Sequence, residues 1–254
     1  IERRGVTPET AAQFHLGYIP DGSVWTTLTD FLTKKRGYTL EECVAAGVTK
    51  KHAESGRYYD VFRGRVLFPI WDMQGGIVGF TGRLLQEQEG VGKYLNTPET
   101  VLFDKGHIVY ALNLAKQAAK EAGFFVVVEG QMDVISCHQA GMRNVVAASG
   151  TALTAAHVAM LKRFAPQVRM AFDADAAGER AAKRGIDIAI EAGLDVRVIR
   201  IPEGAGKDPD ECIKKDPKVW EQAVADSQPV FAYYIDRYVT PAVRKDPNQL
   251  RDAG

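Results

Sequence analysis

The sequence predicts an α/β fold: a Rossmann-like parallel sheet that is preceded by a mixed α+β subdomain and followed by a truncated C-terminal helical segment. Three observations predict it. From residue 124 onward, short apolar runs of strand length alternate with stretches of helical spacing, which is the pattern of β-α-β units. Residues 61–83 hold two β-rich runs around a tight glycine turn, a pattern typical of a hairpin. Residues 217–238 have helical spacing again.

The first 50 residues are expected to form helices joined by loops. Thr7 can cap a short helix that has Pro8 at its first position, where the missing N–H of proline has no intrahelical partner to lose. Thr39 and Glu42 have the spacing of a capping box, and an apolar stretch follows them until Gly47. This combination predicts a second short helix that ends at the glycine.

The predicted hairpin follows these helices. Its two runs, residues 65–71 and 76–81, flank Gln74-Gly75. Residues 84–100 are polar and predict a loop. Residues 107–122 have apolar side chains at helical spacing and predict a helix.

The second half of the chain predicts a parallel sheet. Its first strand is a continuous apolar run, Phe124-Phe125-Val126-Val127-Val128, as expected for a strand that is covered on both faces. Four strands are predicted at residues 124–128, 144–148, 167–172 and 195–201. Helices are predicted between them at residues 131–140, 154–166 and 177–192. The predicted domains are 1–120, 121–216 and 217–254, the last of which is incomplete.

Acidic residues follow three of the four predicted strands. Glu129 follows the first strand, Asp173 and Asp175 follow the third, and Asp208 and Asp210 come in the segment after the fourth. The carboxyl ends of parallel strands lie at one edge of the sheet, where ligands bind, so we expect these acids to converge. Converging carboxylates repel one another unless a cation lies among them. Carboxylate oxygens suit Mg²⁺ or Mn²⁺, so the sequence predicts a divalent-metal site for phosphoryl transfer.

The acids differ in how strongly they indicate this site. A single Asp-x-Asp pair such as Asp173 and Asp175 is also typical of helix caps and turns. Glu129 is harder to explain without a site, because it follows five apolar residues and a buried acid without a partner is costly. Asp133 stands four residues after Glu129 on the same predicted helix face, and it can either join the site or cap the helix.

Composition excludes several classes of protein. Of the 254 residues, 46% are hydrophobic and 25% are charged, which is ordinary for a globular chain. No apolar run approaches the roughly 20 residues that a membrane span needs, and the first residues hold no secretory signal. The three cysteines are far apart and form no C-x-x-C pair, so they predict neither a zinc site nor a disulfide framework. The chain begins with Ile1 rather than Met, so we expect a fragment of a longer protein.

Three motifs resemble the TOPRIM domain, which DnaG-type primases share with type IA and II topoisomerases, RecR-like repair proteins and some nucleases. They are Val127–Ile135, Phe172–Gly178 and Asp208–Asp210. Two upstream runs, Arg65–Ile70 and Lys93–Thr100, are similar to the segment before TOPRIM in bacterial DnaG-type primases. The Lys93–Thr100 run is the most specific part of the resemblance, because topoisomerases lack it. The resemblance covers roughly residues 3–238.

This resemblance implies the RNA-polymerase core of a bacterial primase, which synthesises RNA primers on single-stranded DNA. A primer 3′-oxygen would attack the α-phosphate of a ribonucleoside triphosphate, and pyrophosphate would leave. The implied cofactors are two or more Mg²⁺ or Mn²⁺ ions, with no zinc in this fragment. Asp173, Asp175 and Asp208 would hold metal, with Asp133 and Asp210 as outer members of the site. Glu129 would either bind metal or act as a general base.

Basic residues in the matching segments are similar to the family's groove for the template backbone and the triphosphate. The residues expected there are Arg4, Arg63, Arg65, Arg83, Lys93, Tyr94, Asn96 and Lys105. For any one of the cations, a salt bridge or a solvated charge is an equally good explanation. Arg83 follows two glycines at the end of the hairpin, which gives a rigid base for a bidentate phosphate contact. Tyr94 can stack on a base, with ordinary packing as the alternative.

The resemblance also implies partners. Single-stranded DNA, ribonucleoside triphosphates and the RNA primer would bind this chain. The replicative helicase and a zinc-binding domain would act through regions that the chain lacks. The resemblance implies a cytoplasmic protein of the bacterial replication fork, within the nucleoid and without membrane contact.

Three other functions fit part of the pattern. A TOPRIM nuclease or topoisomerase fragment shares the acids, but a topoisomerase needs a catalytic Tyr on a separate domain, and no such domain fits here. A non-catalytic DNA-binding scaffold of the RecR kind predicts DNA binding without nucleotide incorporation. An unrelated α/β enzyme could use the Asp-x-Asp pair for a sugar nucleotide, but Glu129-Gly130 and the Lys93–Thr100 run argue against it.

Overall fold

The computed structural model describes residues 4–22, 24–86, 90–150, 152–171 and 176–238. The chain divides into two compact units, Ile1–Asn113 and Leu114–Gly254, and each has its own main β-sheet. The domain bounds expected from the sequence remain predictions. Within the described ranges, every helix is too short or too polar to cross a membrane.

The described part of the first unit combines short helices with two antiparallel sheets. A four-stranded sheet has the order β1-β4-β5-β6, and β2 pairs with β3. The strands are β1 (Gly17–Ile19), β2 (Thr49–Lys51), β3 (Tyr58–Asp60), β4 (Arg65–Trp71), β5 (Ile77–Leu84) and β6 (Tyr94–Asn96). The helices are α1 (Pro8–Gln13), α2 (Thr27–Arg36), α3 (Leu40–Ala45), the 3-10 helix η2 (Lys105–His107) and the start of α4 (Leu112–Ala122). The predicted hairpin is confirmed as β4 and β5.

Both predicted helix caps of the first unit are confirmed. The Thr7 hydroxyl accepts a hydrogen bond from the Thr10 backbone N–H at 3.2 Å, with Pro8 as the first helical residue of α1. The Thr39 hydroxyl accepts from the Glu42 N–H at 3.1 Å, and the Glu42 carboxylate accepts from the Thr39 N–H at 2.7 Å. These reciprocal bonds satisfy backbone groups that the first turn of a helix leaves without partners.

The prediction of a loop over residues 84–100 is wrong at β6. Tyr94, Leu95 and Asn96 pair with Arg83, Gly82 and Thr81 of β5. The segment is a short edge strand with polar ends, so it carries too few alternating apolar residues to be recognised from the sequence.

Gly82→Ala is expected to lower the free energy of unfolding by about 1–3 kcal/mol, because an added methyl group would overpack the sheet. A Cβ at residue 82 would lie 2.6 Å from the Phe62 ring and 2.9 Å from Arg65 Cδ. Denaturant unfolding measures the change beside Gly22→Ala, where the nearest heavy atom to a Cβ is 4.0 Å away. Equal losses of stability in the two variants would contradict this packing.

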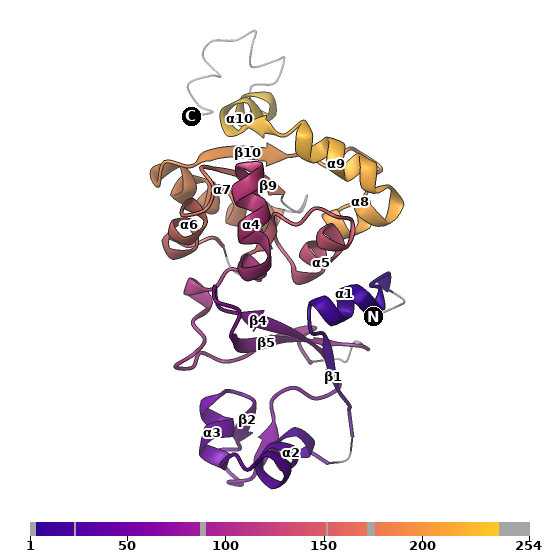
Figure 1. Ribbon diagram of the computed structural model, residues 1–254, viewed down its shortest axis with the longest axis vertical. Helices are drawn as coiled ribbons and strands as arrows, with labels where there is room; N and C mark the ends of the chain where they lie inside the picture. Colours follow the sequence, from indigo (N-terminus) through magenta and orange to yellow (C-terminus); the bar gives the residue numbers. More distant parts are fainter. Residues whose placement is uncertain (1–3, 23, 87–89, 151, 172–175, 239–254) are drawn as a thin grey trace. The chain divides into compact units, whose positions relative to one another are not determined.

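The described part of the second unit is built on a five-stranded sheet of order β11-β10-β9-β7-β8. The strands are β7 (Phe124–Val128), β8 (Val145–Ala147), β9 (Gln167–Ala171), β10 (Asp195–Ile199) and β11 (Gln228–Pro229). β7 to β10 run parallel, whereas β11 is antiparallel to β10. The helices are α5 (Gln131–Gln139), α6 (Ala155–Lys162), α7 (Ala176–Glu191), α8 (Pro209–Lys215), α9 (Pro217–Ala225) and α10 (Val230–Tyr238). Figure 1 shows this unit from magenta α4 and α5 to yellow α8, α9 and α10.

The order of the parallel strands reverses between β7 and β9. The connection through α5 leads from β7 to β8 at one side, whereas the connection through α7 leads from β9 to β10 at the other. Because β-α-β crossovers are right-handed, this reversal places α5 and α7 on opposite faces of the sheet. In sheets of this kind, ligands bind beyond the carboxyl ends of the strands at the point of reversal.

The single helix predicted over residues 217–238 is wrong, because β11 separates α9 from α10. Pro229 has no backbone N–H and disfavours helical geometry at the residue before it. Gln228 instead pairs with Val198 of β10, and the Arg197 guanidinium donates to the Ser227 carbonyl at 2.9 Å. The helix α8 is also absent from the prediction.

Candidate functional site

Glu129 lies where the strand order reverses. β7 and β9 are parallel neighbours with Val127 opposite Met170, so both strands end at the same edge of the sheet. Glu129 is the first residue after β7 and is half-buried. Asp173 and Asp175 follow β9 in the sequence but lie outside the described residues. Their convergence with Glu129 therefore remains a prediction.

Asp208 is the N-cap residue of α8. Its Oδ1 atom accepts a hydrogen bond from the Glu211 backbone N–H at 2.8 Å, and Pro209 is the first helical residue. In the same turn, Lys207 pairs with the Glu211 carboxylate at 3.0 Å, and the hydrogen bond from Lys207 lowers the pKa of Glu211. The cap fixes the orientation of the Asp208 carboxylate at the start of α8.

Asp133 is buried, and its carboxylate joins two segments of the backbone. Its Oδ2 atom accepts from the Gly130 N–H at 3.1 Å, directly after Glu129. Its Oδ1 atom accepts from the Asp210 N–H at 3.2 Å. Asp133 therefore acts as a cap of α5 and also holds the start of α8, while its membership of a metal site remains a prediction.

Asp210 is also buried, with 5% of its surface exposed. Its carboxylate accepts a hydrogen bond from the Ser136 hydroxyl of α5 and forms an ion pair with Lys214 at 2.6 Å. Asp133 and Asp210 thus fasten α8 to α5 through charge-assisted hydrogen bonds, which are stronger than neutral ones.

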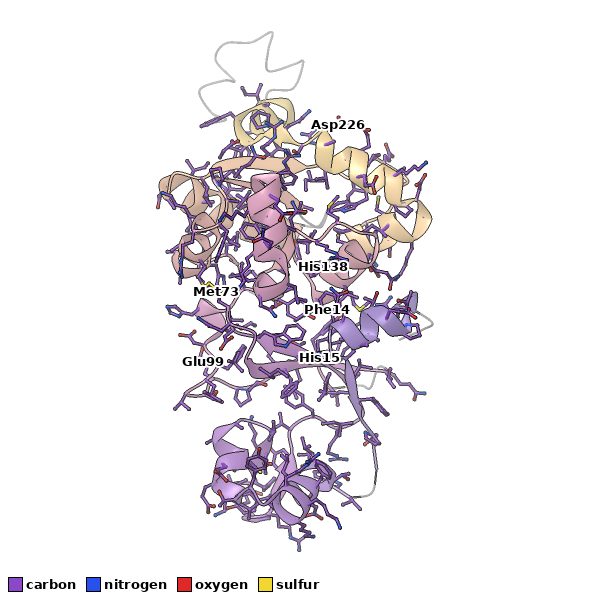
Figure 2. The ribbon with its side chains drawn as sticks, viewed as in Figure 1. Phe14, His15, Met73, Glu99, His138 and Asp226 are labelled. Carbon is purple, nitrogen blue, oxygen red and sulfur yellow. The ribbon has the colours of Figure 1, made fainter. Side chains whose placement is uncertain are left out.

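The far end of α5 is held by the sheet. His138, whose position on α5 Figure 2 marks, forms a hydrogen bond through Nε2 with the Val145 carbonyl of β8 at 2.9 Å. Burial lowers the pKa of His138, and burial raises the pKa of the neighbouring Cys137 thiol well above its ordinary value. Helix α5 is therefore a fixed support for the loop that carries Glu129.

Only some of the residues predicted to bind metal are among the described residues. Among them, no group of three or more His, Cys, Asp or Glu side chains could hold a metal ion. Asp173 and Asp175 are not among these residues. Glu129 and Asp208 carry carboxylate oxygens, the donors that Mg²⁺ and Mn²⁺ prefer. The predicted site fits a hard divalent cation, and its completion depends on the two aspartates after β9.

In the first unit, the strands β5 and β6 bring four of the predicted binding residues together: Arg83, Lys93, Tyr94 and Asn96. Arg83 and Tyr94 are cross-strand partners, and the guanidinium lies 5.4 Å from the centroid of the ring. Tyr94 is 45% exposed, and Lys93 is exposed immediately before β6. The Asn96 side chain accepts a hydrogen bond from the Thr81 hydroxyl at 2.7 Å. An exposed ring beside a guanidinium, with a lysine next to it in the sequence, suits single-stranded nucleic acid.

The other predicted arginines have different surroundings. The Arg63 guanidinium lies 4.0 Å from the centroid of the Trp25 ring and 3.4 Å from the Asp21 carboxylate. Arg65 is buried with 5% exposure, and burial lowers the pKa of its guanidinium. Arg4 is exposed. The burial of Arg65 does not fit the direct phosphate contact that the sequence predicts for it.

Lys105 lies in the single turn η2, which its own neighbours hold in place. The Asp104 carboxylate accepts from the Gly106 N–H at 2.8 Å and pairs with His107 at 2.7 Å. Before this turn, the Thr100 hydroxyl accepts from the backbone N–H of buried Phe103 at 3.0 Å. These bonds fix the loop from which Lys105 extends.

The sequence did not point to three residues that contact the predicted site residues. Lys214 stands four residues after Asp210 on one helix, so the spacing of opposite charges could have revealed it. Ser136 meets Asp210 across 74 residues, and Trp25 meets Arg63 from another element. No local pattern predicts such contacts.

Two family models match most of the chain. Residues 1–116 match the model described as the N-terminal domain of the DNA primase catalytic core. Residues 126–213 match a Toprim-like model. The match to the first model ends close to the boundary between the two compact units, and the match to the second begins within β7 and ends within α8.

Individual DNA primases are also similar to this chain in sequence and in structure. The DNA primase of Clostridium acetobutylicum is 43% identical over 248 residues, which cover 97% of this chain and 40% of that protein. The chain therefore spans less than half the length of this relative. A DNA primase domain from Pseudomonas aeruginosa has a similar structure, with 36% identity and a TM-score of 0.82 over 94% of this chain and 74% of that one. A DnaG primase catalytic domain bound to single-stranded DNA has 34% identity and a TM-score of 0.79 over 96% of this chain and 77% of that one.

Proposed function

This chain belongs to the bacterial DnaG-type DNA primases, as the RNA-polymerase core with its TOPRIM fold, and from that membership we propose that it synthesises RNA primers on single-stranded DNA. The observation that carries the proposal is the place of Glu129 at the reversal of the sheet. The neighbouring strand β9 continues in sequence into Asp173-Ala174-Asp175. Acids at this point are suited to bind the metal-complexed phosphates of a nucleotide.

The chain's own residues would bind the cation and keep the acids in place. TOPRIM primase cores use divalent metal ions, and we propose two or more Mg²⁺ or Mn²⁺ ions held by Glu129, Asp173, Asp175 and Asp208. A bound ion would neutralise charge on the triphosphate. Asp133 of α5 accepts a hydrogen bond from the Asp210 N–H, and Asp210 of α8 accepts one from the Ser136 hydroxyl of α5. These bonds hold the segments that carry Glu129 and Asp208. Glu129 either coordinates an ion or accepts the proton of the attacking 3′-hydroxyl.

The template would bind the first unit through β5, β6 and the loop that follows. Arg83, Lys93 and Lys105 supply positive charge, and Tyr94 supplies an exposed ring beside Arg83. A similar DnaG catalytic domain was solved with single-stranded DNA, which supports the same partner here. Arg4, Arg63 and Asn96 are further members of this proposed surface.

Other partners and the location follow from the same membership. We propose ribonucleoside triphosphates as substrates and an RNA primer as the product. The replicative helicase and a zinc-binding domain would act through other parts of a longer protein at the bacterial replication fork in the cytoplasm. We propose three domains: residues 1–120 bind the template and nucleotide, residues 121–216 bind metal, and residues 217–254 begin a C-terminal helical subdomain.

Primer synthesis on single-stranded DNA with labelled ribonucleotides tests the proposal. We expect incorporation that requires Mg²⁺ or Mn²⁺, and a loss of incorporation in Asp173→Ala. Incorporation by both proteins, or by neither at high enzyme concentration, would contradict the proposal. Labelled DNA in a parallel reaction separates the alternatives, because a nuclease cleaves it when metal is added. A non-catalytic scaffold binds the DNA and does neither reaction.

A further inference from the structure

Arg65 is the first residue of β4, and its side chain extends across the neighbouring strand. Residues 65 and 84 are partners in the β4–β5 register, and Leu67 is opposite Gly82. The absence of a side chain at Gly82 makes room for the arginine, because a Cβ there would lie 2.9 Å from Arg65 Cδ. The guanidinium therefore reaches beyond β5 toward the start of β6.

Three backbone carbonyls accept hydrogen bonds from this guanidinium. Arg65 Nη1 donates to the Gly82 carbonyl and to the Lys93 carbonyl, both at 3.1 Å, and Nη2 donates to the Gly92 carbonyl at 2.9 Å. The Lys93 carbonyl also accepts from the Leu84 N–H at 3.0 Å. The backbone immediately before Tyr94 is thus fixed from β4 and from β5 together.

We propose that Arg65 is a positioning residue for nucleic-acid binding, which fixes the backbone of Gly92 and Lys93 so that Lys93 and Tyr94 meet the template in one arrangement. The inference rests on the proposed function, because it assumes that the β5–β6 surface binds single-stranded DNA. Arg65 itself does not touch the template. Its 5% exposure and its three carbonyl partners leave the phosphate contact to Lys93 and Arg83.

Lysine cannot replace arginine in this role. An ammonium group is a single point charge, whereas the guanidinium is a planar fork whose separate N–H groups reach several acceptors at once. Arg65→Lys keeps the positive charge but cannot hold the Gly82, Gly92 and Lys93 carbonyls together. A residue that contacted a phosphate directly would keep most of its binding in this variant.

The slope of binding affinity against salt concentration tests the proposal on the full chain. Binding of a labelled oligothymidylate is measured at several salt concentrations for the wild type, Arg65→Lys, Arg65→Gln, Lys93→Ala and Arg65→Gln/Lys93→Ala. Each phosphate contact contributes a slope of roughly −0.7 to log affinity against log salt. We expect Arg65→Lys and Arg65→Gln each to flatten the slope by about this amount, as Lys93→Ala does. The slope of the double variant should be close to that of Lys93→Ala alone.

Each contrary outcome has a defined meaning. A wild-type slope in Arg65→Lys, together with a double variant whose slope flattens twice as much as that of Lys93→Ala, would show that Arg65 binds phosphate itself and overturn the proposal. Unchanged slopes with only a lower melting temperature would show a purely structural role and also overturn it. Arg57→Gln, at an exposed arginine of the same unit, is the matched control. A flat wild-type slope would contradict the proposed template surface rather than the role of Arg65.

Discussion

Replacing Glu129 by glutamine is expected to lower the rate of primer synthesis by about 100-fold or more, the usual effect of removing one group that stabilises charge in a transition state. Glutamine has nearly the same shape but no charge, so it can neither bind a divalent ion well nor accept a proton. The measurement is ribonucleotide incorporation on single-stranded DNA at saturating Mg²⁺. DNA binding should remain at the wild-type level, because the residues proposed to bind the template belong to the first unit.

A second measurement separates the two roles left open for Glu129. Titration with Mn²⁺ should show an affinity at least about tenfold weaker if the carboxylate coordinates metal, since each lost contribution of 1.4 kcal/mol is a factor of ten. Unchanged metal affinity with a slow reaction would assign the general-base role. Glu191→Gln, at an exposed acid at the end of α7, is the matched control and should be fully active. A wild-type rate in Glu129→Gln would exclude Glu129 from the reaction.

Asp133→Ala is expected to lower the free energy of unfolding by about 2–4 kcal/mol, because it leaves two backbone N–H groups without their acceptor. These are the Gly130 N–H at 3.1 Å and the Asp210 N–H at 3.2 Å. Asp133→Asn should be destabilised in the same direction, since its NH₂ group must face one of the two donors. Denaturant unfolding without metal measures both changes.

The sign of this effect distinguishes the two roles predicted for Asp133. If Asp133 served only as a metal ligand among converging acids, Asp133→Asn would relieve their repulsion and stabilise the metal-free chain. Destabilisation of Asp133→Asn instead supports a structural role, in which the Asp133 carboxylate holds the start of α8 against α5. Asp226→Ala, at the exposed C-cap of α9 that Figure 2 labels, is the control and should change stability by no more than about 0.5 kcal/mol.

Sequence patterns predicted the sheet well because β7 and β8 are buried almost throughout, and β9 and β10 alternate between buried and partly exposed residues. The β7 prediction, Phe124–Val128, agrees with the structure at both ends, since five consecutive apolar residues fit nothing else of that length between turn residues. The capping box of Thr39 and Glu42 was equally predictable from the sequence, because it depends on residues three positions apart. Predictions failed at β6 and at β11, where two or three residues form a strand only because a neighbouring edge supplies hydrogen-bond partners.

The site shows the same division between local and distant contacts. Glu129 was identified from its place after an apolar strand, and its position at the reversal of the sheet agrees with that reasoning. The local partners of Asp133 and Asp210, the Gly130 N–H and Lys214, lie within four residues and follow from spacing, whereas the contact between Asp133 and the Asp210 N–H, the contact between Asp210 and Ser136, and the surroundings of Arg65 were not predictable. These distant partners come from other elements, and the charge of a side chain does not indicate whether it binds a ligand or a carbonyl of its own chain.

Residues within a few positions of one another were enough to predict the order of β7 to β10 with the helices between them, the helix caps and the acids at strand ends. The metal site was predicted from these acids, and the resemblance of the upstream Lys93–Thr100 run to primases indicated which metal-dependent reaction the site serves. The tertiary structure was needed to show which charged residues have distant partners within the protein. It placed Arg65 behind Gly82 with three carbonyls and joined Asp133 to the start of α8. Such contacts depend on packing between distant segments, and burial then makes each unsatisfied polar group costly enough to fix its partner.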